Sequence, residues 1–183
     1  MKKTNIILIG ILVFSIFPIF YANAAIAAYG SKYIYPDGDY QTPQWGPRDG
    51  EGHWWRVAEQ TEEEYIFSFI SPCLDKYTLS NPGLSSQYIP QVKMMVYASI
   101  VIGSIPDNTK LDMYMRIDGV TYKKTVTVQG DYTWYEFSLS CPSGYWTAAD
   151  INGMRCRVQS YWYFGEILLS RIKIKVYWTT TPP

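Results

Sequence analysis

Residues 110–128, KLDMYMRIDGVTYKKTVTV, decide the fold class of this chain. Apolar side chains occupy every second position from Leu111 to Ile117, and a period of two indicates a strand with one buried face. The dipeptide Asp118-Gly119 separates this strand from a second alternating segment. A type I′ turn needs positive φ at both central residues, which Asp-Gly supplies, so the stretch predicts an antiparallel hairpin.

The same alternation continues on both sides of the hairpin. Residues 91–103 place Met94 and Val96 on one face, and residues 132–140 do the same with Phe137. The first clear strand along the chain is predicted at residues 53–59, and further strands are expected at 31–35, 65–70, 76–79, 154–163 and 167–178. Because no long helical period and no βα alternation interrupt them, we expect an all-β fold, an antiparallel two-sheet β-sandwich of jelly-roll or lectin-like form.

One stretch, SGYWTAADING at residues 143–153, departs from the strand pattern. Thr147 and Asp150 have the spacing of a capping box, in which each side chain accepts a hydrogen bond from the other residue's backbone. The two alanines between them favour a helix. We therefore interpret the stretch as one short helical turn between two strands, with Trp146 at an end of the core. Asp150 is then a capping acid and not a catalyst.

The N-terminal residues have the composition of a secretory signal peptide. Lys2 and Lys3 precede an apolar run of 15 residues that ends at Phe20, and Ala22-Asn23-Ala24 supplies the small residues of a cleavage site. A retained membrane anchor is the alternative. The run is shorter than the ~18–20 residues that a spanning helix needs, so cleavage is the favoured interpretation.

Signal cleavage sets the expected domain organisation and localisation. We expect a signal helix at residues 1–24, a loop-rich N-terminal arm at 25–52, and the β-sandwich domain at 53–183. The protein is then secreted or displayed at the cell surface, with no membrane span after cleavage. Loss of Lys2 and Lys3 leaves 14 basic against 16 acidic residues. Proteins that grip a phosphate backbone carry a basic excess, so no nucleic-acid partner is expected.

The chain has three cysteines, an odd number that suits one disulfide and one leftover thiol in an exported protein. Cys141 ends a predicted strand and Cys156 lies early in the next, and this spacing favours a bridge between them. The other two pairings stay open. In the favoured pairing, Cys73 is either a buried apolar side chain or a free thiol.

Few residues have the chemistry of a catalytic centre. The single histidine, His53, would have to serve any Ser-His-Asp or Cys-His site, and we interpret it as a solvated turn residue. Glycoside hydrolysis needs two carboxylates that flank the bond, and Glu136 and Asp112 are the candidates because aromatic residues lie beside them. A non-catalytic protein is the favoured interpretation. A polysaccharide-active hydrolase or lyase that uses these two acids is the alternative.

No cofactor is expected, with calcium as the one alternative. Calcium needs only oxygen ligands, and Asp37, Asp39, Asp49 and Glu51 lie close together in the arm. The Asp-Gly-Asp stretch among them is also common turn chemistry, which is the interpretation we favour.

Aromatic residues make up 17% of the chain, and several fall on the outward side of predicted strands. If the alternation holds, Tyr97, Tyr114, Trp134 and Tyr177 point away from the core. Outward rings form platforms for sugar rings or anchors for a protein partner. Ordinary strand composition, with the outer faces partly covered, explains them equally well.

Three basic residues, Arg171, Lys173 and Lys175, alternate with apolar residues on the last predicted strand. They suit either a groove for an anionic polymer or the protection of an edge strand by lysine. We favour edge protection.

The order of these features resembles the concanavalin-A-like or jelly-roll sandwich modules of secreted, cell-surface and virion-associated prokaryotic proteins. The resemblance covers residues 89–178, including an aromatic strand that ends at Pro142 and the W-T-x-x-D-I-N stretch, with a weaker echo at 55–57. It implies an exported binding or structural module and transfers no active site. The expected function is a non-catalytic extracellular module for surface assembly or adhesion. Its expected partners are a glycan bound through outward aromatics, a surface protein, or further copies of the chain.

Overall fold

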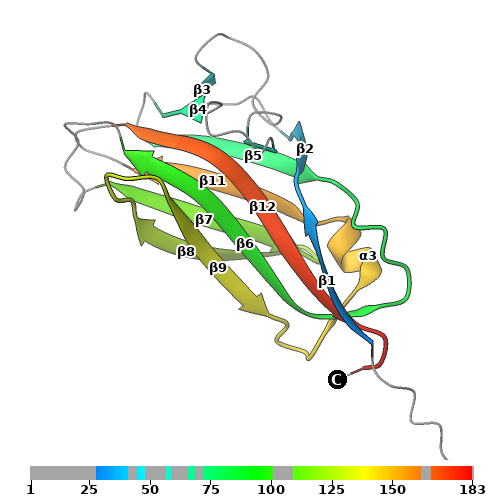
Figure 1. Ribbon diagram of the computed structural model, residues 1–183. Helices are drawn as coiled ribbons and strands as arrows, with labels where there is room; N and C mark the ends of the chain where they lie inside the picture. Colours follow the sequence, from blue (N-terminus) through cyan, green and yellow to red (C-terminus); the bar gives the residue numbers. More distant parts are fainter. Residues whose placement is uncertain are drawn as a thin grey trace, which may run out of the picture.

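Two antiparallel sheets lie face to face in the computed structural model and form a β-sandwich (Figure 1). The structure describes residues 28–40, 45–47, 57–58, 66–68, 72–100, 109–161 and 166–182. Every strand pairing within this described part is antiparallel. The predicted fold class is confirmed, whereas the signal helix and its cleavage site lie outside the described residues.

The first sheet is built on its two longest strands, β6 (Tyr88–Ile100) and β12 (Ile167–Thr179), which pair along most of their length. Shorter strands flank this pair. β9 and β10 lie beside β6, β1 and β4 lie beside β12, and β3 pairs with β4. Their bounds are β1 (Tyr29–Ile34), β3 (Gly46–Pro47), β4 (Ile66–Phe67), β9 (Thr133–Ser140) and β10 (Trp146–Thr147). β12 is therefore an interior strand.

The second sheet has the strand order β2-β5-β11-β7-β8. Its bounds are β2 (Pro36–Asp39), β5 (Cys73–Leu79), β7 (Lys110–Ile117), β8 (Val120–Thr127) and β11 (Arg155–Tyr161). The chain crosses between the sheets repeatedly, for example from β5 to β6 and from β6 to β7. Each sheet is therefore assembled from segments that are far apart in the sequence.

The core lies between the sheets and consists of the alternate positions that the sequence pattern predicts. Met94, Val96 and Met113 are fully buried, and Phe137 is 8% exposed. Burying a side chain of this size contributes ~1.5–3 kcal/mol. The burial of these side chains between the sheets also determines which residues of each strand face outward, because neighbouring side chains on a strand point to opposite sides.

The predicted hairpin at Asp118-Gly119 is confirmed. Ile117 pairs with Val120, and both turn residues have positive φ, 48° for Asp118 and 75° for Gly119. This is the conformation that a two-residue type I′ connection requires.

The predicted helical turn after Trp146 is also confirmed, as α3 (Ala148–Asn152). The Thr147 backbone N–H donates to the Asp150 carboxylate at 2.8 Å, and the Thr147 hydroxyl accepts from the Asp150 backbone N–H at 3.3 Å. Trp146 is 5% exposed and belongs to the core. Asp150 therefore has the capping role that the sequence indicates.

The strand predicted at residues 53–59 is wrong where the structure describes it. Val57 and Ala58 are helical, and Val57 is fully buried among the core residues. A short apolar run predicts burial but does not distinguish a strand from a buried helical turn. The rest of that segment, including His53, lies outside the described residues.

The predicted bridge between Cys141 and Cys156 is wrong, because all three cysteines are free, buried thiols. Cys156 points into the core from β11, the central strand of the second sheet. Cys141 follows β9 of the first sheet, and its Sγ lies 3.3 Å from Ser143 Oγ. Burial raises the pKa of the Cys156 thiol, which keeps it protonated and unreactive.

No helix in the described part of the chain is long and apolar enough to cross a membrane.

The turn assignment predicts that Gly119→Ala lowers the free energy of unfolding by about 1–2 kcal/mol, because alanine is strained at positive φ. Gly130→Ala is the matched control, since an added Cβ there meets nothing within 4 Å and its φ is not left-handed. Its effect should stay within about 0.5 kcal/mol. Urea unfolding followed by tryptophan fluorescence measures both variants, and equal losses would contradict the assignment.

The free-thiol state makes a second prediction. A chromogenic thiol reagent should detect three thiols in the chain unfolded without reductant, as expected for three free cysteines. The folded protein should react far more slowly, because all three side chains are buried. Detection of only one thiol after unfolding would show that the other two cysteines form a disulfide, which would contradict this assignment.

Candidate functional site

Three of the four predicted ligand-binding aromatics lie on the outer face of the first sheet. Tyr97 on β6 is paired directly with Trp134 on β9, and Tyr177 lies on β12. The neighbouring inward positions are sealed in the core, so these side chains point outward. We call this surface the aromatic face. It comprises Tyr33, Lys93, Met95, Tyr97, Tyr132, Trp134, Glu136, Arg171, Lys173, Lys175 and Tyr177.

Three rings form a continuous cluster at one end of the aromatic face. The ring centres of Tyr97 and Tyr132 are 5.2 Å apart with 26° between the planes, and those of Tyr97 and Trp134 are 5.0 Å apart with 33° between the planes. Aromatic rings whose centres lie ~4.5–7 Å apart attract one another. All three side chains are half-buried, so the cluster is an ordered apolar patch that still reaches solvent.

Basic side chains from β12 lie over these rings. Lys173 Nζ is 4.1 Å from the centre of the Trp134 ring and 5.0 Å from that of Tyr33, and the Arg171 guanidinium is 5.6 Å from the centre of Tyr97. Cations within ~6 Å of a ring centre are attracted to it. The rings therefore hold these cations in place on the sheet.

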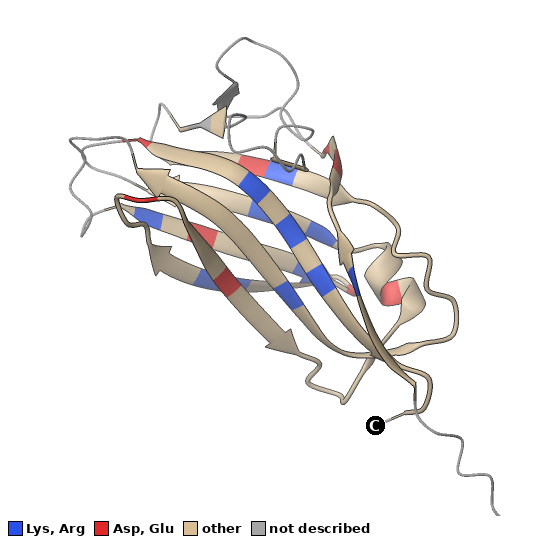
Figure 2. Ribbon diagram, in the orientation of Figure 1, with Lys and Arg blue, Asp and Glu red and all other residues tan. Residues whose placement is uncertain are grey.

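The interpretation of this basic series as edge protection is wrong. β12 lies between β6 and β1, and Lys175 on β12 pairs with Lys93 on one side and Tyr33 on the other. Figure 2 shows the basic positions recurring along β12 in the middle of the sheet. Because β1 and β4 pair with β12 on the side away from β6, β12 is not an edge strand of the sheet, and the series needs another explanation.

Positive charge dominates the aromatic face. Lys93 Nζ lies 2.8 Å from the Glu136 carboxylate, and this hydrogen bond raises the pKa of Lys93. Arg171, Lys173 and Lys175 form no ion pair with any carboxylate of the described residues. Burial, followed by the nearby charge of Arg171, lowers the pKa of Lys173. Burial disfavours the charged form of a lysine, and the neighbouring cations Arg171 and Lys175 add to this effect, whereas the charge of Glu136 opposes it.

A pocket of ≈ 190 Å³ opens beside Trp134. Arg171 and Lys173 line it on the side of β12, and Tyr35 and Ala58 are among the residues that line the other side. It lies along the part of β12 between the residues that pair with β4 and those that pair with β1. A ligand ring stacked near Trp134 would therefore have two cations within reach.

The fourth predicted aromatic, Tyr114, lies on the opposite outer face, on β7 of the second sheet. It is only 8% exposed, because the Arg157 guanidinium stacks 3.6 Å from its ring centre. Its hydroxyl donates to the Asp112 carboxylate at 3.0 Å, and burial together with this hydrogen bond raises the pKa of Tyr114. Tyr114 is therefore not part of the aromatic face.

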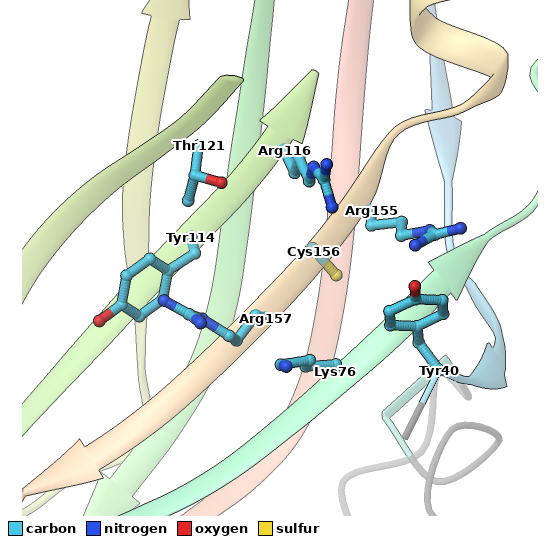
Figure 3. Close-up of a pocket in the computed structure, with 8 residues that line it drawn as sticks. All are labelled: Tyr40, Lys76, Tyr114, Arg116, Thr121, Arg155, Cys156 and Arg157. Atoms are coloured by element: carbon cyan, nitrogen blue, oxygen red, sulfur yellow. The ribbon is translucent and has the colours of Figure 1, made fainter. Parts of the chain in front are cut away.

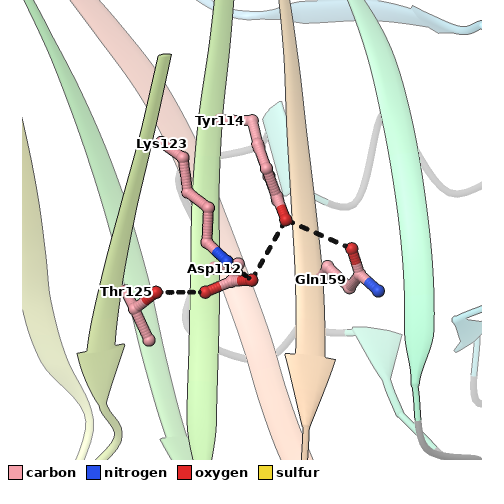
Figure 4. Close-up of polar contacts among 5 residues, drawn as sticks. All are labelled: Asp112, Tyr114, Lys123, Thr125 and Gln159. Carbon is pink, nitrogen blue, oxygen red and sulfur yellow. Dashed lines mark hydrogen bonds and ion pairs between the residues drawn. The ribbon is translucent and has the colours of Figure 1, made fainter. Parts of the chain in front are cut away.

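Asp112 is the centre of a polar network on that second face (Figure 4). Its carboxylate is 1% exposed, lies 2.6 Å from Lys123 Nζ, and also accepts from the hydroxyls of Tyr114 and Thr125. The hydrogen bond to Asp112 raises the pKa of Lys123. Every oxygen of this carboxylate has a partner, which is the arrangement of a structural acid.

The two candidate catalytic acids, Asp112 and Glu136, lie on opposite faces of the sandwich. Asp112 points outward from the second sheet, whereas Glu136 points outward from the first sheet and is paired with Lys93. The whole core separates them. The two carboxylates therefore do not flank a common bond, as the glycosidase alternative requires.

The residues of the calcium alternative are only partly described. Asp37 accepts a hydrogen bond from the Thr78 hydroxyl at 2.7 Å, and Asp39 ends β2. Asp49 and Glu51 lie outside the described residues. Within the described ranges, no group of three or more His, Cys, Asp or Glu side chains is placed to hold a metal ion.

Two aromatic residues of the face, Tyr33 and Tyr132, were missed by the sequence reasoning. Tyr33 lies on β1, which pairs with β12, and Tyr132 immediately precedes β9. Tyr132 lies two residues before Trp134 and therefore falls on the same side of an extended chain, which the sequence alone indicates. The position of Tyr33 depends on the pairing of β1 with β12, and no local pattern predicts that pairing.

The fold and the register together define a β-sandwich module with one aromatic, basic outer face. No protein-family model matches the chain, and no curated protein sequence matches it. Solved structures are similar to it in fold. The CBM22-1 xylan-binding domain from Paenibacillus barcinonensis Xyn10C has a TM-score of 0.46 at 14% identity, over 81% of this chain and 97% of that one.

Two further structures show the same level of similarity. TmCBM61, solved in complex with β-1,4-galactotriose, has a TM-score of 0.39 at 9% identity, over 82% of this chain and 86% of that one. The enzymatically active domain of bacteriophage CBA120 tailspike protein 4 has a TM-score of 0.41 at 9% identity, over 82% of this chain and 19% of that one. The expected resemblance to sandwich modules is confirmed for the fold alone, and scores below 0.5 carry no argument about a ligand.

The Asp112 network predicts that Asp112→Asn lowers the free energy of unfolding by about 1–3 kcal/mol, because a buried charge-assisted network loses its anion. Asp131→Asn, at an exposed turn, is the control and should change it by less than about 0.5 kcal/mol. Chemical unfolding at pH 7 measures both variants.

The pH dependence of that loss follows from the raised pKa values of Lys123 and Tyr114. Stability from a raised pKa is fully present below the unfolded value and is lost as the pH rises through the folded value. The difference between wild type and Asp112→Asn should therefore persist to about pH 10 and shrink only above it. A difference that disappears between pH 6 and 8 would contradict the network.

Proposed function

We propose that this protein is a non-catalytic, extracytoplasmic module that binds an acidic glycan on its aromatic face. The observation that carries the proposal is the continuous cluster of Tyr132, Tyr97 and Trp134, with Arg171 and Lys173 beside it, neither of which is paired with a carboxylate of the described residues. A flat apolar patch among polar donors suits a sugar ring, which has apolar faces and a polar rim.

The charge of the face favours an acidic sugar over a neutral one. Arg171, Lys173 and Lys175 lie in a row along β12, and the single acid of the face, Glu136, is already paired with Lys93. Among the described residues, none of these three cations forms an ion pair, and cations grouped on one surface raise the local concentration of anions and attract carboxylate or sulfate groups. Alternate residues on an extended strand are ~6.6–6.8 Å apart, so the row presents charge at intervals suited to a repeating polymer.

Adhesion is the role that fits this ligand, with the module displayed outside the cell or secreted. The surface-assembly role, a surface-protein partner and homo-oligomers stay predictions from the sequence. One outermost strand of the second sheet, β8, carries Lys123 and Lys124, and lysine on an edge strand opposes edge-to-edge pairing. This edge therefore argues against strand-mediated assembly.

Affinity electrophoresis through polygalacturonate, with neutral xylan as the comparison, tests the proposal. The wild type should be retarded by the acidic polymer more than by the neutral one. Trp134→Ala and Tyr97→Ala should each weaken retardation by at least about tenfold, because each removes a central ring. Trp134→Phe should recover part of it, since an aromatic face is restored.

Tyr161→Ala is the matched control, because Tyr161 is 38% exposed and lies on the second sheet, on β11. This variant should run like the wild type, and thermal unfolding should show that all variants are folded. Wild-type retardation of both ring variants, or no retardation of the wild type by any of a panel of acidic polysaccharides, would refute the proposal.

A further inference from the structure

We propose that the outer face of the second sheet holds a separate pocket for a compact oxyanion, a carboxylate, sulfate or phosphate group. The pocket has a volume of ≈ 130 Å³. Four of its lining residues are basic, Lys76, Arg116, Arg155 and Arg157, and no acid is among the described residues that line it. It lies across the core from the aromatic face and does not depend on the glycan proposal.

The strand register places these cations in two adjacent like-charge pairs. Arg155 on β11 lies directly opposite Arg116 on β7, and Arg157, two residues further on, lies directly opposite Lys76 on β5. Like charges at directly opposed positions destabilise a sheet. The Arg155–Arg116 pair, with Arg157 two residues further along β11, therefore concentrates positive charge on the central strands, which an anion would relieve.

Two tyrosines orient the arginines (Figure 3). The Arg155 guanidinium lies 3.6 Å from the ring centre of Tyr40, and the Arg157 guanidinium lies 3.6 Å from that of Tyr114. Stacking fixes the plane of a guanidinium and leaves its N–H edge free to donate. A preorganised guanidinium edge matches the paired oxygens of a carboxylate, sulfate or phosphate.

The acid that β7 presents on this face is already occupied. Asp112, one row beyond Tyr114 on β7, is bound by Lys123 and by the hydroxyls of Tyr114 and Thr125. Among the described residues, no carboxylate forms an ion pair with Arg116, Arg155 or Arg157. Within the described ranges, the charge of these three arginines is therefore not neutralised by a carboxylate.

An orphaned donor lies at the same place. Nε of Arg157 is buried and has no hydrogen-bond partner among the described residues. A buried donor without a partner costs free energy, and native structures contain few of them. The described part of the chain therefore leaves Arg157 unsatisfied both in hydrogen bonding and in charge.

The size of the pocket sets the kind of occupant. A single water needs roughly 10–15 Å³ of such space, so ≈ 130 Å³ accommodates a compact anion of several atoms. Tyr40 and Tyr114 at its sides confine it. The pocket therefore suits one oxyanion group, either a free ion or the charged substituent of a larger molecule whose remainder extends into solvent.

Titration of the full folded chain with three probes, sodium phosphate, sodium sulfate and sodium glucuronate, tests the inference. Sodium chloride at matched ionic strength controls for screening. At least one oxyanion should raise Tm above the chloride value and give a saturable heat in calorimetry. The probe that binds most tightly tells whether the natural group is a phosphate, a sulfate or a carboxylate, and each of these results supports the proposal.

Substitutions locate the binding. Arg155→Gln and Arg116→Gln should each weaken the best probe by about tenfold or more, and Arg155→Lys should also weaken it because the planar donor edge is lost. Lys110→Gln is the matched control, because it removes one charge from the same face of β7 outside the pocket. It should bind as the wild type does.

A further readout separates a binding role from a structural one. Without oxyanion and at low salt, Arg116→Gln should have an unchanged or higher Tm, because it relieves the repulsion with Arg155. A fall in Tm under these conditions would overturn the proposal. Equal responses to oxyanions and chloride, or wild-type binding by both arginine variants, would also overturn it. This titration measures oxyanion binding, whereas the glycan proposal is tested by retardation in polysaccharide gels. Either proposal can therefore fail while the other stands.

Discussion

The burial of apolar side chains between the two sheets is the constraint on which the outer faces of this protein depend. Val92, Met94 and Val96 are fully buried on β6, so their neighbours Lys93, Met95 and Tyr97 must face out. A slip of one residue in the pairing of β6 with β9 or β12 would turn the apolar series to solvent and the aromatic series into the core. The burial of the core therefore positions the ligand-facing rings, although none of its residues lies at the site.

Local sequence was sufficient to predict what depends on neighbours along the chain. The turn at Asp118-Gly119, the capping box of Thr147 and Asp150, and the outward direction of Tyr97 all follow from short-range chemistry. Each depends only on a local backbone conformation or on the alternation of side chains along one strand. Such features are decided within a few residues, and the structure agrees with the sequence at all three.

What the sequence could not predict is which strands become neighbours. Tyr97 and Tyr114 have similar local patterns and both point outward, yet they lie on opposite sheets. Because the strand pairing could not be predicted, two of the sequence-based predictions were wrong. The last strand was assigned to an edge although β1 covers it, and Cys141 and Cys156 were joined although their strands lie in different sheets. Long-range pairing is set by the fit of the whole core, and no local motif encodes it.

The position of Lys173 couples stacking to charge recognition on the aromatic face. Its ammonium group lies 4.1 Å from the centre of the Trp134 ring, so a sugar that stacks on that side of the ring must displace the lysine. A neutral sugar would exchange a cation–π attraction for a stacking contact, and the released lysine would remain beside Arg171 with no carboxylate from the described residues to pair with. An acidic sugar offers the displaced ammonium a carboxylate or sulfate, which converts that loss into a charge-assisted hydrogen bond. Under the proposed function, the aromatic ring and the lysine would therefore select together for a ligand that has both an apolar ring face and a negative charge, because either property alone would leave one of the two groups worse off than in the free protein.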